Sequence, residues 1–333
     1  MLKLINKYKR FLILISFAYI YIVAILLIPS KVRVLTPGET TNTFNIYNVE
    51  EVEINKNFNT LSVYNWHNVT VFQKWITENN VRYDQSEIRK DLTRKDLGLQ
   101  GRISNESSHN NAVITAYKYA NKINSNITIN YELQSLTIYD TNSNNLKIGD
   151  EIIKINNESI TTNSYEDYLS NLNLYNNNKY IKNTNSILTI KRGNEVIEIN
   201  LNENEALYFY PKYEILNTSP KYLGFKEDLN VGGPSGGAIQ AISLYTSLLN
   251  IDLKNVKIAG TGTIETNNNF SIGNIGGVVQ KYYTALNNQM NYLILPKDNF
   301  NELRMAISNL NKDLTVISVE SFDDLIKLVG DIS

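Results

Sequence analysis

One serine of this chain is surrounded by four glycines, in the sequence Val231-Gly232-Gly233-Pro234-Ser235-Gly236-Gly237. A mostly apolar segment follows, and we predict a helix over residues 238–249. Glycines let the backbone approach a ligand closely and adopt conformations that are closed to other residues. Ser235 would then lie beside unpaired N–H groups at the positive end of a helix, where an oxyanion is stabilised. This turn predicts a nucleophilic serine. A phosphate-binding turn or a plain turn is the alternative.

A second glycine-rich turn, over residues 271–277, leads into a predicted helix that contains Lys281. Buried strands are predicted before and after it, at residues 257–264 and 292–295. A lysine can take the proton of a serine only as the neutral amine, so its ordinary pKa of ~10.4 must fall by about three units, or ~4 kcal/mol. Burial among apolar side chains causes such a fall. Lys281 has suitable neighbours on its helix: Val278, Val279, Tyr282, Ala285 and Leu286.

The composition excludes several other kinds of chemistry. The 333 residues include no Cys and two His, so there is no disulfide, thiolate nucleophile or Cys-ligated metal, and no cofactor or metal is expected. We expect both His67 and His109 to be structural or surface residues. The net charge of −1 gives no basic footprint for nucleic acid. No G-x-x-x-x-G-K-S/T sequence occurs, so there is no sign of an ATPase.

The N-terminal segment is predicted to be a membrane anchor. Residues 11–28 contain no charge and, as a helix, would cover ~27 Å, about the thickness of a bilayer core. Basic residues precede this run more densely than they follow it, which places the N-terminus in the cytoplasm. A cleaved signal peptide is the alternative. However, the apolar run is longer than the apolar region of a usual signal peptide, and no small-x-small cleavage site follows it before Pro29.

The body is predicted to contain two regions of different pattern. Before residue 125 we expect strands at 32–35 and 44–52, and helices at 69–78 and 108–122. The first of these helices places four apolar residues on or near one face: Val71, Phe72, Trp75 and Ile76.

Short strands are expected from residue 127 to 202. A short helix is predicted at 164–172, and a hairpin at 187–191 and 195–201.

The sequence Leu146-Lys-Ile-Gly-Asp-Glu-Ile-Ile-Lys-Ile-Asn-Asn157 resembles the L-x-x-G-D-x-I-x-x-V/I-N-G pattern of PDZ domains, with Asn157 where glycine is usual. The alternative is another small β-rich module. The resemblance implies that this region binds an extended peptide by adding it to the edge of a sheet.

Residues 220–330 resemble the proteolytic domain of the Lon family. That family has G-P-S-A-G around its nucleophilic serine, then I-G-G-x-x-x-K with a lysine base, and then I-P-K-x-N. The resemblance implies that Ser235 is the nucleophile, Lys281 the base, and Thr261 the residue that hydrogen-bonds the lysine. Its supporting residues would be Gly233, Pro234 and Gly236.

The chain departs from the Lon pattern at several positions. Gly232 and Thr263 stand where Lon has acidic residues, and Gly236 replaces an alanine. The run Asn267–Asn269 lengthens the turn before Lys281. None of these changes removes a catalytic group.

Together these features are similar to the membrane-anchored, PDZ-containing Lon-like serine proteases of Gram-positive bacteria. We expect an α+β chain with a cytoplasmic N-terminus (1–10), a transmembrane anchor (11–29), an extracytoplasmic segment packing with the protease (30–125), a PDZ-like domain (126–204) and a Lon-like α/β proteolytic domain (205–333).

The predicted function is an ATP-independent extracytoplasmic serine endopeptidase with a Ser/Lys dyad. Its partners would be peptide or protein substrates and the membrane, and not nucleic acid. A homo-oligomer stays open, because Lon-type domains often form rings. One alternative function is a catalytically inactive peptide-binding adaptor. Another is a phosphate or nucleotide binder at 232–237, although this turn contains no lysine or acidic residue to support such binding.

Overall fold

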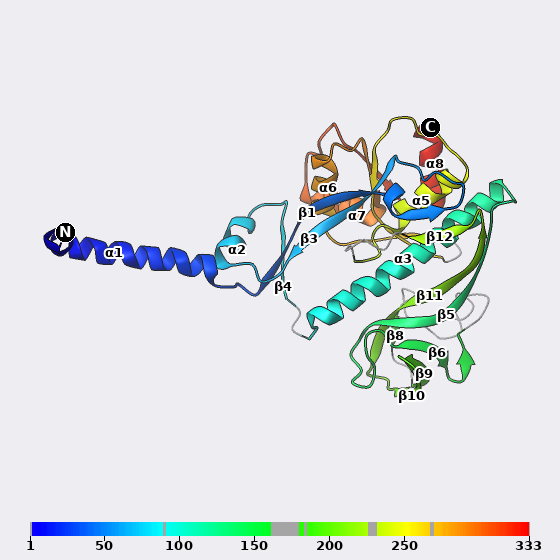
Figure 1. The fold of residues 1–333 in the computed structure, drawn as a ribbon, viewed down its shortest axis with the longest axis horizontal. Coiled ribbons are helices and arrows are strands. Elements are labelled where there is room, and N and C mark those ends of the chain that lie inside the picture. Colours follow the sequence, from blue (N-terminus) through cyan, green and yellow to red (C-terminus); the bar gives the residue numbers. More distant parts are fainter. Residues whose placement is uncertain are drawn as a thin grey trace.

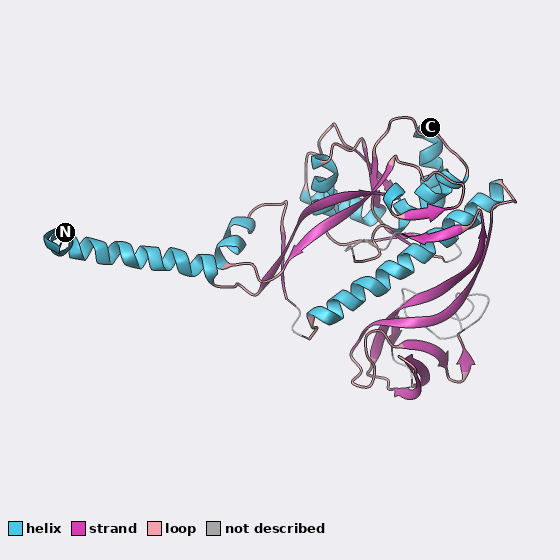
Figure 2. Cartoon of the chain, viewed as in Figure 1, coloured by secondary structure: helices cyan, strands magenta, loops and turns pink. Residues whose placement is uncertain are grey.

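The computed structural model describes residues 2–88, 91–160, 180–182, 185–225, 232–266 and 270–332. Helices and strands are mixed throughout the body, which confirms the predicted α+β class, and a single long helix extends from it at the N-terminus (Figures 1 and 2).

The projecting helix is α1 (Leu2–Leu27). Its part from Tyr8 to Leu27, 20 residues, is long and apolar enough to cross a membrane, and none of it is buried inside the protein. No second helix in the described ranges meets both conditions. The apolar helix expected from the sequence is therefore present.

Six strands form the sheet of the main body. Their order is β17 (Thr315–Val319), β16 (Tyr292–Pro296), β13 (Ile258–Gly260), β3 (Phe58–Trp66), β1 (Val32–Asn42) and β4 (Asp84–Glu87). The pairs from β17 to β3 are parallel, and those from β3 through β1 to β4 are antiparallel. Strands from both ends of the sequence thus share one sheet.

The strand expected at 44–52 is mostly not a strand. The chain there forms a short 3-10 turn (Thr43–Asn45), because the side chain of Asn42 accepts a hydrogen bond from Phe44 N and ends β1. Only β2 (Tyr47–Val49) is extended, and it pairs with β12 (Tyr222–Phe225).

Helices cover both faces of the six-stranded sheet. One face carries α3 (Arg94–Ile123), α5 (Gly237–Leu248) and α8 (Phe322–Ile332), and the other carries α6 (Val278–Asn287) and α7 (Lys297–Ala306). The alternation along β16 explains this, because Ile294 joins the first core while Leu293 and Leu295 join the second. Both faces are therefore apolar, as in a sheet buried between two helical layers.

Helix α3 is twice as long as the predicted segment 108–122. It has 30 residues and begins at a capping box, in which Thr93 and Asp96 bond each other's backbone N–H groups. Its C-terminal half contributes Val113 to the core of the main body and Ile114 to the core of the second sheet. The helix therefore lies between the two sheets (Figure 1).

The second sheet has seven strands and is curled (Figure 2). Its order is β10 (Glu195–Leu201), β9 (Ser186–Arg192), β6 (Glu151–Ile155), β5 (Thr128–Thr141), β11 (Ala206–Ser219) and β8 (Tyr180–Lys182), with β7 (Glu158–Ser159) paired to β6. The predicted hairpin is confirmed as β9 and β10. The helix predicted at 164–172 lies outside the described residues.

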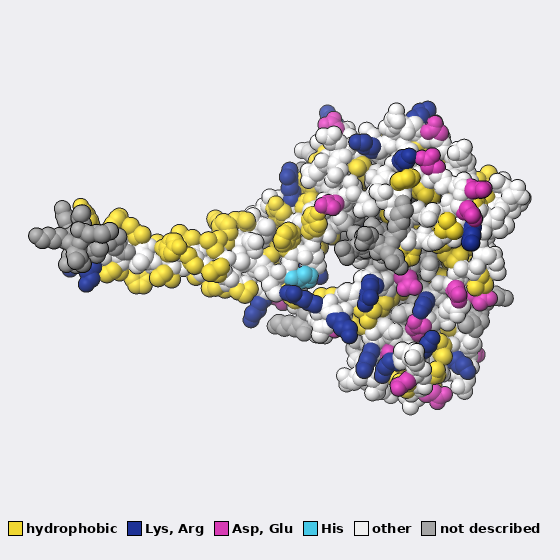
Figure 3. Space-filling model, viewed as in Figure 1, with side chains coloured by type: hydrophobic (Ala, Val, Ile, Leu, Met, Phe, Trp, Pro, Cys, Tyr) yellow, Lys and Arg dark blue, Asp and Glu magenta, His cyan; other side chains and the backbone are white. Residues whose placement is uncertain are grey.

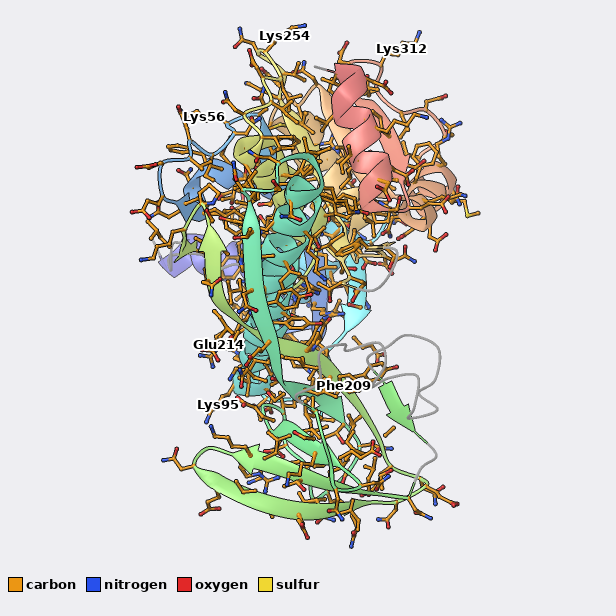
Figure 4. The ribbon with its side chains drawn as sticks, turned by 90° about the vertical axis from the view of Figure 1, so that its right-hand side faces the viewer. Lys56, Lys95, Phe209, Glu214, Lys254 and Lys312 are labelled. Atoms are coloured by element: carbon orange, nitrogen blue, oxygen red, sulfur yellow. The ribbon has the colours of Figure 1, made fainter. Side chains whose placement is uncertain are left out.

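A buried core and one ion pair hold the second sheet together. Phe209 on β11 is fully buried in this core, and it is labelled within the second sheet in Figure 4. Asp150, 2% exposed, accepts two hydrogen bonds from Arg192, at 2.8 and 2.7 Å. Asp150, from the Gly-Asp part of the sequence pattern, thus links the turn before β6 to the end of β9.

Candidate active site

Ser235 lies in the turn that precedes α5. The helix begins at Gly237, with Gly236 as its N-cap, so the predicted helix is confirmed to within one residue at each end. Gly233 has a φ of +103°, which a residue with a side chain rarely adopts. The turn that brings Ser235 to the start of the helix therefore requires glycine at position 233.

The turn rests on helix α3, which the sequence did not connect with the site. Gly233 N donates to Gly101 O at 3.1 Å, and Ser108 Oγ donates to Pro234 O at 2.9 Å. The two segments are so close that a Cβ on Gly237 would lie 2.6 Å from Ser108 Oγ. The N–H of Gly233 is therefore already engaged and is not free to bind an oxyanion.

Lys281 lies in the first turn of α6, and 3% of it is exposed. Its Nζ donates a hydrogen bond to Thr261 Oγ1 at 2.9 Å. Burial lowers the pKa of Lys281 from 10.5 to about 7. Three of its apolar neighbours on the helix, Val278, Tyr282 and Ala285, are buried as well. Near neutral pH a large fraction of this lysine is thus the neutral amine.

Thr261 connects the lysine with the serine. It directly follows β13 and is 1% exposed. Its Oγ1 donates to Ser235 O at 2.9 Å, and Gly262 N donates to the same oxygen at 2.7 Å. The end of a central strand therefore fixes the backbone of Ser235 and the side chain of Lys281 together.

Ser235 and Lys281 both line a cleft of 390 Å³ in the surface. Strand β3 forms another wall of the cleft through Ser62, Val63 and Tyr64. The remaining lining residues are Leu61, Gly232, Pro234, Thr263, Asn274, Ile275 and Gly276. The contribution of β3 had no signal in the sequence, because a strand's partner in a sheet is not encoded locally.

His109 is buried next to the candidate nucleophile. It is 1% exposed, and its Nδ1 is 3.1 Å from the hydroxyl of Tyr47. Its ring stacks on Phe225, and it borders a cavity of 30 Å³ that Ser235 also lines. Burial lowers the pKa of His109 to about 4, so the ring is neutral near pH 7. His67, in contrast, is exposed.

In the part of the chain that the structure describes, no three His, Asp or Glu side chains are grouped as a metal site.

Two features named in the sequence analysis, Val231 and the run Asn267–Asn269, lie outside the described residues.

Comparison with known proteins identifies the region that holds the site. Residues 228–330 match the family model described as the Lon protease (S16) C-terminal proteolytic domain. This match indicates a serine peptidase. Over 95 residues, 28% of the chain, the sequence is 30% identical to a Lon protease of Azospirillum brasilense. The matched part is only 11% of that relative's length. Ser235, Thr261 and Lys281 all fall within the residues that match this family model, whereas Gly101 and Ser108, which hold the turn of Ser235, lie outside them.

Proposed function

We propose that the chain is an ATP-independent serine endopeptidase, anchored in the membrane with its catalytic body on the extracytoplasmic side. Ser235 is the nucleophile, Lys281 is the general base, and Thr261 is a positioning residue. The observation that carries the proposal is the buried lysine, which is held by Thr261 in the cleft that Ser235 lines. A surface lysine would stay protonated and could not act as a base at neutral pH.

In the first half of the proposed reaction, Ser235 Oγ attacks the scissile carbonyl carbon and its proton passes to Lys281 Nζ. The lysine then donates that proton to the leaving amine as the C–N bond breaks, which leaves an acyl-enzyme. In the second half, a water attacks the ester and gives its proton to Lys281. The ester bond breaks, Ser235 recovers its proton from the lysine, and the carboxylate product leaves.

The negative charge on the tetrahedral intermediate needs hydrogen-bond donors at the turn. Gly233 N already donates to Gly101 O, so we assign this role to the N–H groups of Ser235 and Gly236 at the start of α5. The positive end of the helix favours the same charge.

The curled second sheet is proposed to be a PDZ-like module. The support for it is the Leu146–Asn157 pattern, whose Asp150 pairs with Arg192 across the sheet. Such a module would present peptides, unstructured tails or flexible loops to the cleft. The chain carries no phosphate-loop sequence, so these substrates would be cut without ATP-driven unfolding.

The test is cleavage of an unstructured protein substrate by the purified full-length chain without ATP. We expect the wild type to cut, and Ser235→Ala and Lys281→Met to be inactive. The control is Lys254→Met, because this exposed lysine does not line the cleft and extends from the end of the body opposite the second sheet (Figure 4), so the variant should retain full activity. Full activity of either site variant would contradict the mechanism. A wild type that binds peptides but neither cuts them nor reacts with a serine-directed probe would favour the inactive adaptor.

A further inference from the structure

The short helix α2 (Val71–Thr77) exposes the face that helices normally bury. It begins at a capping box between Thr70 and Gln73. Its apolar residues have the spacing i, i+1, i+4 and i+5, which places them on one side of the helix. Three of them are exposed, Val71 at 38%, Trp75 at 66% and Ile76 at 50%, and no residue of α2 is buried. Phe72 is half-buried, with its ring centroid 6.1 Å from that of Trp75.

This face adjoins the end of the apolar helix α1. Val71 N donates to Ile28 O at 3.0 Å, and Ser30 N donates to Val69 O at 2.9 Å. These backbone bonds fix the start of α2 against the residue that follows α1. Figure 1 shows α2 at the junction between α1 and the body, and Figure 3 shows hydrophobic side chains covering α1 and continuing onto the junction. Exposed apolar side chains of both helices therefore lie on either side of this junction.

A second tryptophan lies at the same junction. Trp66 ends β3 and is 57% exposed, and it pairs with Val34 near the start of β1. Lys31, exposed, lies between the end of α1 and this strand. Tryptophans next to an apolar span, with a lysine beside them, are typical of the zone where phospholipid headgroups meet the acyl chains.

We propose that a surface made of Trp66, Val71, Phe72, Trp75 and Ile76, the aromatic patch, lies in the headgroup–acyl boundary of the bilayer that α1 crosses. The occupant of the patch is thus the phospholipid bilayer itself. The proposal rests on the membrane anchoring of α1 and does not depend on the peptidase activity.

The aromatic patch would fix the height of the catalytic cleft above the membrane. Tyr64 lines the cleft and is two residues before Trp66 on β3, a separation of roughly 7 Å along a strand. With Trp66 at the bilayer surface, the cleft opens beside the membrane instead of at the end of a free tether. The body would therefore be held in one orientation by two attachments, α1 and the aromatic patch.

The test uses the intrinsic fluorescence of the full-length protein in phospholipid vesicles. The chain has two tryptophans, and both belong to the aromatic patch, so no label is needed. We expect vesicles of lipids brominated near the glycerol end of their acyl chains to quench most of the emission. Aqueous iodide should quench little of it. Trp66→Phe and Trp75→Phe, each with one tryptophan left, should both show this pattern.

A matched control places a tryptophan elsewhere. In a variant with both native tryptophans changed to Phe, Val196→Trp puts the ring on β10 of the second sheet, where Val196 is 64% exposed. This tryptophan should be quenched by iodide and not by the brominated lipid. The proposal is overturned if the native tryptophans behave like the control while the protein floats with the vesicles after alkaline washing. Release of the protein from the vesicles by alkaline washing would also overturn the proposal, because it would show that α1 does not anchor the chain in the membrane. Peptide cleavage measured on the same samples reports on the peptidase independently.

Discussion

Lys281 and Thr261 are joined by a hydrogen bond of 2.9 Å from Nζ to Oγ1, and both residues are almost completely buried. The hydroxyl of Thr261 donates a hydrogen bond to the carbonyl oxygen of Ser235, so the lone pairs of Oγ1 are left to accept from the lysine. The amine is thereby held through one of its N–H groups, and its lone pair is left for a proton from the cleft. This arrangement accounts for how a serine and a lysine could act together without a histidine.

Thr261→Val should impair catalysis without removing either reacting group. Valine has a similar shape but cannot accept from the lysine, and the loss of one hydrogen bond of this kind costs roughly 1.5–3 kcal/mol. We expect kcat to fall about 10- to 100-fold with little change in KM. Thr261→Ser, which keeps the hydroxyl, should recover most of the rate. Equal activity of the valine and serine variants would show that the hydroxyl has no positioning role.

Lys281→Met should stabilise the protein, most strongly at low pH. The folded pKa of Lys281 is about 7 against 10.5 ordinarily, so between these values the unfolded chain binds a proton that the folded chain lacks. The wild type therefore gains stability as the pH rises through this window. The variant lacks this dependence, and below about pH 7 it should be more stable by roughly 3–5 kcal/mol. Urea unfolding across the pH range, with Lys254→Met as the control, measures the difference. A difference that does not change with pH would contradict the depressed pKa.

Acid should destabilise the fold through His109. Its pKa falls from 6.5 to about 4 on folding, because the ring is buried, so the unfolded state binds the extra proton between these values. Stability is thus lost as the pH drops from about 6.5 to 4, by roughly 3 kcal/mol from this residue. His109→Phe should lose less stability over this range because phenylalanine binds no proton, and Tyr47 keeps its hydrogen bond to Gln240 in the variant. The control is His67→Phe, at the exposed histidine, and it should follow the wild type. An identical acid profile for the His109 variant would refute the role of this burial.

The sequence was sufficient where local chemistry determines structure. The apolar run after Ser235 predicted α5 to within one residue, and the spacing of apolar residues around Lys281 indicated the burial that the structure has. The hairpin of β9 and β10 was likewise predicted, since its turn residues and alternation are contained in one short segment.

The sequence was insufficient where distant segments meet. Residues 94–107 contain two glycines and few apolar residues, so their pattern did not predict the first half of α3. This half is positioned by contacts with the turn that contains Ser235, through Gly101 and Gly233. The capping pair Thr93 and Asp96 was the one local signal for its true start. Similarly, nothing local in β3 indicated that it would lie beside β13 and form a wall of the cleft.

The proposed mechanism requires that the neutral amine of Lys281 activate Ser235. The most direct measurement is the rate at which a fluorophosphonate probe modifies Ser235, followed by intact-protein mass across about two pH units on either side of the lysine pKa. We expect the rate to rise with pH along a single ionisation centred near 7, Lys281→Met to remove the reaction, and Lys254→Met to leave it unchanged. A rate that does not depend on pH, or labelling of Lys281→Met as fast as the wild type, would contradict it.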